Sequence, residues 1–326
     1  MRYTTMNTKI FLLASCLTLG LGFTSCFDLN KSPEGVLSTD RPFTSTGEIR
    51  NYLNMFYETG LRRQGLFAGG GSGIAGDDVM SDNISGGALN ARLNGQVALS
   101  DAKKLDEYTH IRNVNYLLTN LKTPDANSSA DYKQCVGEAY YFRAWYYYQL
   151  LISYGGVTLL DAPLEPVADK LKLPRNTRLE VADHILKDLD LAIQYLGEQS
   201  SAASMRVHRD VARALKAEVA LFEATWERYH KAKDDAFYDK AVTEDKIRDY
   251  LNQAVAAAKA VVDRGVWKIS TSGRPNDDYR ELFQTTNLSS NPEVLWYKRY
   301  DGNEVGNNVN RYLNRGGGVI GLTSSL

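Results

Sequence analysis

The sequence lacks an excess of charge of either sign. It has 38 Lys and Arg against 39 Asp and Glu, so its formal net charge is -1 over 326 residues. Proteins that bind nucleic acid neutralise phosphates with an excess of positive charge. We therefore expect no nucleic-acid partner. The remaining composition, with 43% hydrophobic and 24% charged residues, is typical of a folded globular protein with one large domain or two ordinary ones.

Histidine and cysteine are also scarce, which limits the chemistry of the chain. None of the four histidines (His110, His184, His208 and His230) is spaced from another His or from Cys as metal ligands are. Cys135 falls in a predicted helix without a neighbouring His, and no Gly-x-Ser-x-Gly elbow is present. The sequence therefore predicts no metal site, no cofactor and no nucleophilic catalysis.

Two weaker motifs occur together in a loop rich in Gly, Asn, Asp and Ser at residues 65–99. The run at 71–76 matches the Gly-x-Gly-x-x-Gly fingerprint of dinucleotide-binding proteins, but no convincing strand precedes it and Asp77 and Asp78 would repel phosphate. These acids and Asp82 could serve as a carboxylate pair of a glycoside hydrolase. They could also bind calcium. We favour a third interpretation, in which they form turns by bonding to their own backbone.

Long hydrophobic runs are limited to one, Ile10–Phe23, which is too short to cross a bilayer as a helix. Lys9 precedes it and small residues follow, as in an export signal that begins at Met1 or Met6. The run ends at Phe-Thr-Ser-Cys26, which resembles the lipobox of bacterial lipoproteins. We expect residues 1–25 to be a lipoprotein signal peptide and Cys26 to carry the lipid; plain secretion with a free Cys26 is the alternative.

The lipid anchor has two consequences for the mature chain. Cys16 is removed with the signal and Cys26 is modified, which leaves Cys135 alone and excludes an internal disulfide. Residues 26–44 contain few side chains that could be buried, so we expect an extended tether between the lipid and the folded part.

Helical periodicity dominates the chain from residue 45 onward. Capping boxes occur at Ser45 with Glu48 and at Thr177 with Glu180. The predicted fold class is mainly α, a decorated tetratricopeptide-like helical-repeat domain with long loops and a little β, including a strand at 294–300. Helices are expected from residue 45, from about 100, over about 130–154, from 177 to a cap at Gly197, over about 208–229 and over about 245–264.

Amide, guanidinium and aromatic side chains in two loops could bind a sugar, because rings stack on its C–H face while polar groups bond its hydroxyls. The first loop follows Asp82 and the second follows the predicted strand. Trp145, Trp226 and Trp296 fall on helix or strand patterns and are assigned to the core. The candidate ligand-binding residues are Asn83, Asn90, Arg92, Tyr300, Arg311 and Tyr312.

Several segments, taken in order, resemble the SusD/RagB family, the starch-utilisation-type outer-membrane lipoproteins of Bacteroidetes. The strongest match runs from Gly137-Glu-Ala-Tyr-Tyr-Phe-Arg-Ala-Trp to Gly155-Gly-Val-Thr-Leu-Leu-Asp161. The lipidated start at 26–33, the loop at 76–82, the helix segment at 111–115 and Glu293-Val-Leu-Trp296 resemble the family as well.

The resemblance implies a non-catalytic protein on the outer face of the outer membrane that captures a glycan or another nutrient. It also implies a partner, a TonB-dependent (SusC-like) transporter barrel that the protein covers as a lid. The chain departs from the family's starch binder because the loop after Asp82 has no Trp or Tyr. The family's chains are longer, so we expect 45–326 to be a SusD-like domain without its C-terminal part. A helical-repeat scaffold that binds only protein is the alternative.

Overall fold

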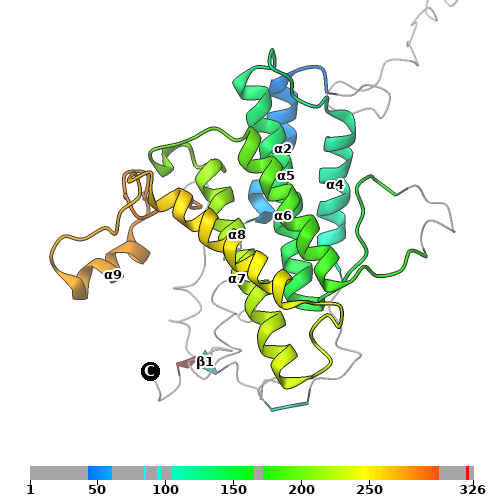
Figure 1. The fold of residues 1–326 in the computed structure, drawn as a ribbon. Coiled ribbons are helices and arrows are strands. Elements are labelled where there is room, and N and C mark those ends of the chain that lie inside the picture. Colours follow the sequence, from blue (N-terminus) through cyan, green and yellow to red (C-terminus); the bar gives the residue numbers. More distant parts are fainter. Residues whose placement is uncertain are drawn as a thin grey trace, which may run out of the picture. The chain divides into compact units, whose positions relative to one another are not determined.

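The computed structural model describes residues 43–60, 84–85, 94–96, 105–164, 172–300 and 321–322. The predicted signal peptide, Cys26 and nearly all of the predicted tether lie outside these ranges. The described part of the chain is mainly helical, which confirms the predicted fold class (Figure 1). Its helices are α2 (Thr46–Gly60), α4 (Glu107–Asn120), α5 (Ala130–Tyr154), α6 (Arg178–Tyr195), α7 (Arg209–Lys233), α8 (Glu244–Val262) and α9 (Pro275–Gln284), with a short 3₁₀ helix at Ala202–Ser204.

Helices that follow one another in the sequence pack side by side, as in a helical-repeat protein. The helix α5 contacts α2, α4 and α6, and the packing continues from α6 to α7 and from α7 to α8 (Figure 1). Because α5 is surrounded, it buries aromatic side chains on several faces, among them Phe142, Tyr146 and Tyr147. None of the described helices is long and apolar enough to cross a membrane.

Local side-chain caps fix where several helices begin. The hydroxyl of Thr177 accepts a hydrogen bond from the backbone of Glu180 (3.2 Å), while the Glu180 carboxylate accepts one from the Thr177 backbone (2.7 Å). Ser129 and Thr243 cap α5 and α8 in the same way, each through a backbone N–H three residues later. These bonds satisfy donors that the first helical turn leaves free.

A glycine permits the close approach of α5 and the end of α6. A Cβ atom on Gly137 would lie 2.9 Å from the backbone nitrogen of Leu196, closer than real Cβ contacts allow. Leu196 already has an extended backbone, and Gly197 donates its N–H to Gln134 of α5 (3.0 Å). The helix therefore ends at Tyr195, stabilised by α5, and not at a glycine cap as we expected.

Other sequence expectations need correction. The helix predicted from about residue 100 begins at Glu107, and α9 was not predicted. Residues 294–300 form no strand. The indole of Trp296 donates to the carbonyl of Met205 (3.0 Å) and packs beside Tyr57 and Tyr141. Trp296 and Trp145 are partly buried against the core, as assigned, and Trp226 is partly buried against Arg178.

Candidate functional site

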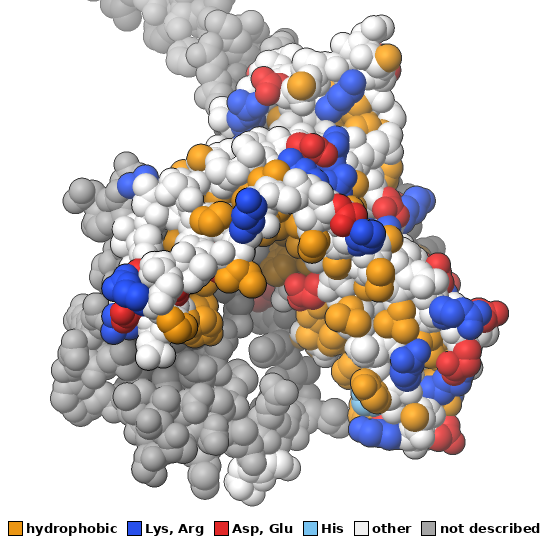
Figure 2. Space-filling model, turned by 60° about the vertical axis from the view of Figure 1, so that its left-hand side comes forward, with side chains coloured by type: hydrophobic (Ala, Val, Ile, Leu, Met, Phe, Trp, Pro, Cys, Tyr) orange, Lys and Arg blue, Asp and Glu red, His pale blue; other side chains and the backbone are white. Residues whose placement is uncertain are grey.

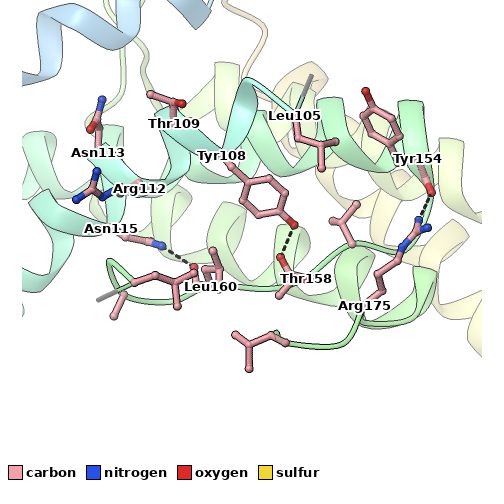
Figure 3. A pocket seen from close by; sticks show the side chains of 14 residues that line it. Leu105, Tyr108, Thr109, Arg112, Asn113, Asn115, Tyr154, Thr158, Leu160 and Arg175 are labelled. Carbon is pink, nitrogen blue, oxygen red and sulfur yellow. Dashed lines mark hydrogen bonds between the residues drawn. The ribbon is translucent and has the colours of Figure 1, made fainter. Parts of the chain in front are cut away.

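A cavity of about 640 Å³ lies between α4 and the segment that connects α5 to α6 (Figure 3). This volume is within the range of about 300–1,000 Å³ that is usual for small-ligand pockets. Its walls combine apolar, aromatic, amide and guanidinium groups. The lining residues are Leu105, Tyr108, Thr109, Arg112, Asn113, Asn115, Tyr154, Val157, Thr158, Leu160, Ala162, Leu164, Leu173 and Arg175.

The helix α4 supplies one wall because its residues at spacings of four and three share a face. Tyr108, Arg112 and Asn115 project from successive turns of that face. The Tyr108 hydroxyl donates to the carbonyl of Thr158 (2.7 Å), and the Asn115 amide donates to the carbonyl of Leu160 (2.6 Å) (Figure 3). These two bonds hold the connecting segment against α4 and fix the Tyr108 ring. Burial raises the pKa of Tyr108, so its hydroxyl stays a donor at neutral pH.

Arg175 closes the other end of the cavity. Its guanidinium donates to the carbonyls of Tyr154 and Gly156, each at 2.7 Å. These carbonyls lie at the C-terminal end of α5, where a helix leaves acceptors without internal partners. Gly156 itself approaches the backbone of the returning chain, since a Cβ there would overlap the carbonyl oxygen of Asn176. Arg175 therefore has a structural task in addition to lining the cavity.

A buried polar cluster lies behind the cavity wall. Arg143 of α5 donates two hydrogen bonds to Asp188 of α6, both at 2.7 Å, and a third to the side-chain oxygen of Asn115 (3.1 Å). Asp161 lies 3.6 Å from Arg143, and His184 lies 3.5 Å from Asp188. The cluster joins three helices and orients Asn115. His184 is largely buried, and desolvation lowers its pKa.

The chemistry of the described lining suits binding. It contains no Asp, Glu, His, Cys or Ser, so this wall offers no pair of carboxylates for glycoside hydrolysis and no activated nucleophile. Across the described ranges, no group of three or more His, Cys, Asp or Glu is arranged to hold a metal ion. The cavity can stack, hydrogen-bond and attract negative charge.

The family of the chain follows from a comparison with family models. Residues 43–221, more than half of the chain, match the SusD-like model described as "Starch-binding associating with outer membrane". The chain belongs to this SusD-like family. No curated protein matches it.

Solved structures support the SusD-like fold. A SusD-like protein from Bacteroides fragilis has 22% identity and a TM-score of 0.59, covering 83% of this chain and 48% of its own. A SusD-like carbohydrate binding protein from the same species has 16% identity and a TM-score of 0.64, covering 86% and 52%. A SusD superfamily protein from Parabacteroides distasonis has 19% identity and a TM-score of 0.53, covering 70% and 47%. The SusD-like chain described here thus spans about half the length of these structures.

Most of the residues predicted to bind sugar lie outside the described ranges of this SusD-like chain: Asn83, Asn90, Arg92, Arg311 and Tyr312. Tyr300 is described, is partly buried and does not line the cavity. The structure does connect the two loops. Strand β1 (Ile84–Ser85) pairs with β2 (Gly321–Leu322) in antiparallel register, with Ile84 opposite Leu322. The pairing brings residue 84 of the first predicted loop next to the end of the second.

The sequence led us to expect a helix from about residue 100 but not a cavity beside it. A signal was present, because Tyr108, Arg112 and Asn115 put polar groups on one face of a short helix. The sequence did not show that the segment after Gly156 returns to cover this face. That contact depends on residues 40 to 50 positions apart.

Proposed function

We propose that the chain is a cell-surface lipoprotein that captures oligosaccharides and delivers them to a TonB-dependent (SusC-like) transporter of the outer membrane. The observation that carries the proposal is the match of residues 43–221 to a starch-binding, outer-membrane-associated family. The lipobox-like sequence at Cys26 supports a lipid anchor on that membrane, facing the cell exterior.

Two places in the chain are candidates for glycan contacts. One is the pair of loops containing Asn83, Asn90, Arg92, Tyr300, Arg311 and Tyr312, whose ends are joined by the β1–β2 pairing. The other is the cavity beside α4. Rings and amides occur in both, as is usual in sugar sites.

Isothermal titration of the full chain against a panel of polysaccharides tests the proposal. We expect saturable binding of at least one glycan, weakened by Tyr300→Ala or by substitutions in the cavity. Absence of binding across the panel would contradict glycan capture. Delivery is tested separately by co-purification of a transporter barrel from the outer membrane, with Cys26→Ala as a variant that lacks the proposed anchor.

A protein-binding scaffold is the second candidate because apolar side chains are exposed along the last described helices. Hydrophobic groups lie between charged ones on the face shown in Figure 2. Val255 and Val262 of α8 are 66% and 72% exposed, and Tyr279 and Phe283 of α9 are 72% and 71% exposed. Exposed apolar patches often mark protein contacts. Tight association with a barrel without any sugar affinity would favour this candidate.

A further inference from the structure

The charged groups of the cavity are all of one sign. Arg112 and Arg175 are its charged lining residues, and no described carboxylate lines it. The described acids nearest in sequence lie outside the lining: Asp161 faces Arg143 and His184, and Asp106 and Glu107 lie at the start of α4. A pocket whose described lining is largely apolar, with two guanidinium groups and no carboxylate, attracts an anion.

The two arginines have different roles. Arg175 donates from Nε and Nη2 to the backbone carbonyls of Gly156 and Tyr154, which fixes its position and engages two of its three nitrogens. Arg112 is exposed on α4 and forms no ion pair with any residue in the described ranges. Figure 3 shows Arg112 and Arg175 at opposite ends of the cavity with Tyr108 between them. Arg112 is therefore the guanidinium whose donors remain available to a ligand.

The neutral lining fits the remainder of a sugar. The Tyr108 ring is held in place by the hydrogen bond of its hydroxyl to Thr158, so it offers a fixed surface for a C–H face. Leu105 and Leu173 flank the cavity and are 44% and 46% exposed. The Asn113 amide lies beside Arg112 and makes only a long contact, 3.9 Å, to the sulfur of Met55. It is thus placed to bond a hydroxyl group.

We propose that this cavity binds a carboxylate-bearing sugar, a uronic acid unit of an acidic glycan, and that Arg112 recognises the carboxylate. The guanidinium can donate two parallel hydrogen bonds to the two carboxylate oxygens, a geometry that Lys cannot reproduce. This inference rests on the proposed function, because it names the class of glycan that the protein captures. A neutral starch-like glycan would leave the positive charge of Arg112 without a partner.

Calorimetry of the full chain with tetragalacturonate, and with maltotetraose as a neutral oligosaccharide of equal length, tests the inference. We expect the wild type to prefer the uronate. Arg112→Gln should weaken uronate binding by about tenfold or more, since a hydrogen bond to a charged group is lost, and should leave neutral sugar binding unchanged. Arg112→Lys should retain part of the affinity. Arg228→Gln, which changes an exposed arginine on α7, is the matched control and should bind like the wild type.

The outcomes separate the inference from the proposed function. Equal binding of acidic and neutral sugars, or an unchanged uronate affinity in Arg112→Gln, would overturn the inference while glycan capture stands. Binding of decanoate with no binding of the uronate would also overturn it, because the carboxylate would then belong to an amphiphile. No binding of any sugar would overturn both.

Discussion

Two buried carboxylates on α7 share a single arginine. Glu223 and Glu227 are each 0% exposed, and Arg178 at the start of α6 lies between them. Its Nη2 is 2.8 Å from a carboxylate oxygen of Glu223, and its Nε is 3.7 Å from one of Glu227. Glu227 also accepts a hydrogen bond from the backbone of Asp239 (2.9 Å). With both acids ionised, this buried group would carry a net negative charge, which is costly away from water.

The structure therefore favours a proton on the pair. Burial, opposed by Arg178 and reinforced by Glu227, raises the pKa of Glu223 from 4.5 to about 8. The pKa of Glu223 is thus higher in the folded chain than in the unfolded one. Stability from this group is greatest at low pH and falls as the pH rises from about 4.5 to about 8. At about 1.4 kcal/mol per pKa unit, the loss of free energy of unfolding amounts to roughly 3–5 kcal/mol.

Glu223→Gln removes this titration while keeping the size of the side chain and an oxygen that faces Arg178. We expect the variant to be more stable than the wild type at pH 9 by several kcal/mol, and the difference to shrink by roughly 3–5 kcal/mol between pH 9 and pH 5. The assay is urea unfolding followed by far-ultraviolet circular dichroism at pH 5, 7 and 9.

Glu218→Gln provides the control, because Glu218 is exposed on the same helix and Gln can still accept the hydrogen bond of Tyr148. Its stability should follow the wild type across the pH range. If the free energy of unfolding of Glu223→Gln also changes with pH as that of the wild type does from pH 5 to 9, Glu223 is ionised in the folded chain and the reasoning fails.

Three further predictions concern packing and covalent chemistry. Gly137→Ala should lower the free energy of unfolding by about 1–3 kcal/mol, because its Cβ would overlap Leu196. In thermal unfolding, Gly197→Ala should lower the stability far less, and equal effects of the two substitutions would contradict the close approach of α5 and the end of α6. Cys135 is buried and its pKa is raised to about 11, so its peptide should stay unmodified by iodoacetamide in the native protein and react after denaturation; rapid native labelling would speak against this packing. Labelling with radioactive palmitate should mark the wild type and not Cys26→Ala, and an unmarked wild type would exclude the lipid anchor.

The cavity adds a site that the predicted loops do not contain. Its fixed parts, Tyr108 and Asn115, are bonded to backbone carbonyls of the connecting segment. Arg112 forms no ion pair with any residue in the described ranges. Substitution of Arg112 therefore removes neither of the two bonds that hold the connecting segment against α4.

The amino-acid sequence by itself determined the class of fold and most helix positions. Thr177 and Glu180 lie three residues apart and form a capping box that starts α6 regardless of its neighbours. Residues 130–154 were predicted and observed as one helix, α5, because an unbroken helix-forming segment ends at two glycines. Such signals act over one or two helical turns, so they can be interpreted without knowing the fold.

Tertiary structure alone decided the rest. Residues 294–300 have strand-like composition but form no strand, and the side chain of Trp296 packs on Tyr57 and donates to the carbonyl of Met205. The cavity exists because Asn115 binds Leu160, 45 residues later in the chain. The raised pKa of Glu223 comes from its burial among packed helices, and Arg178 from another helix opposes the rise. Contacts between distant residues are set by how whole helices pack, and local sequence patterns do not contain that information.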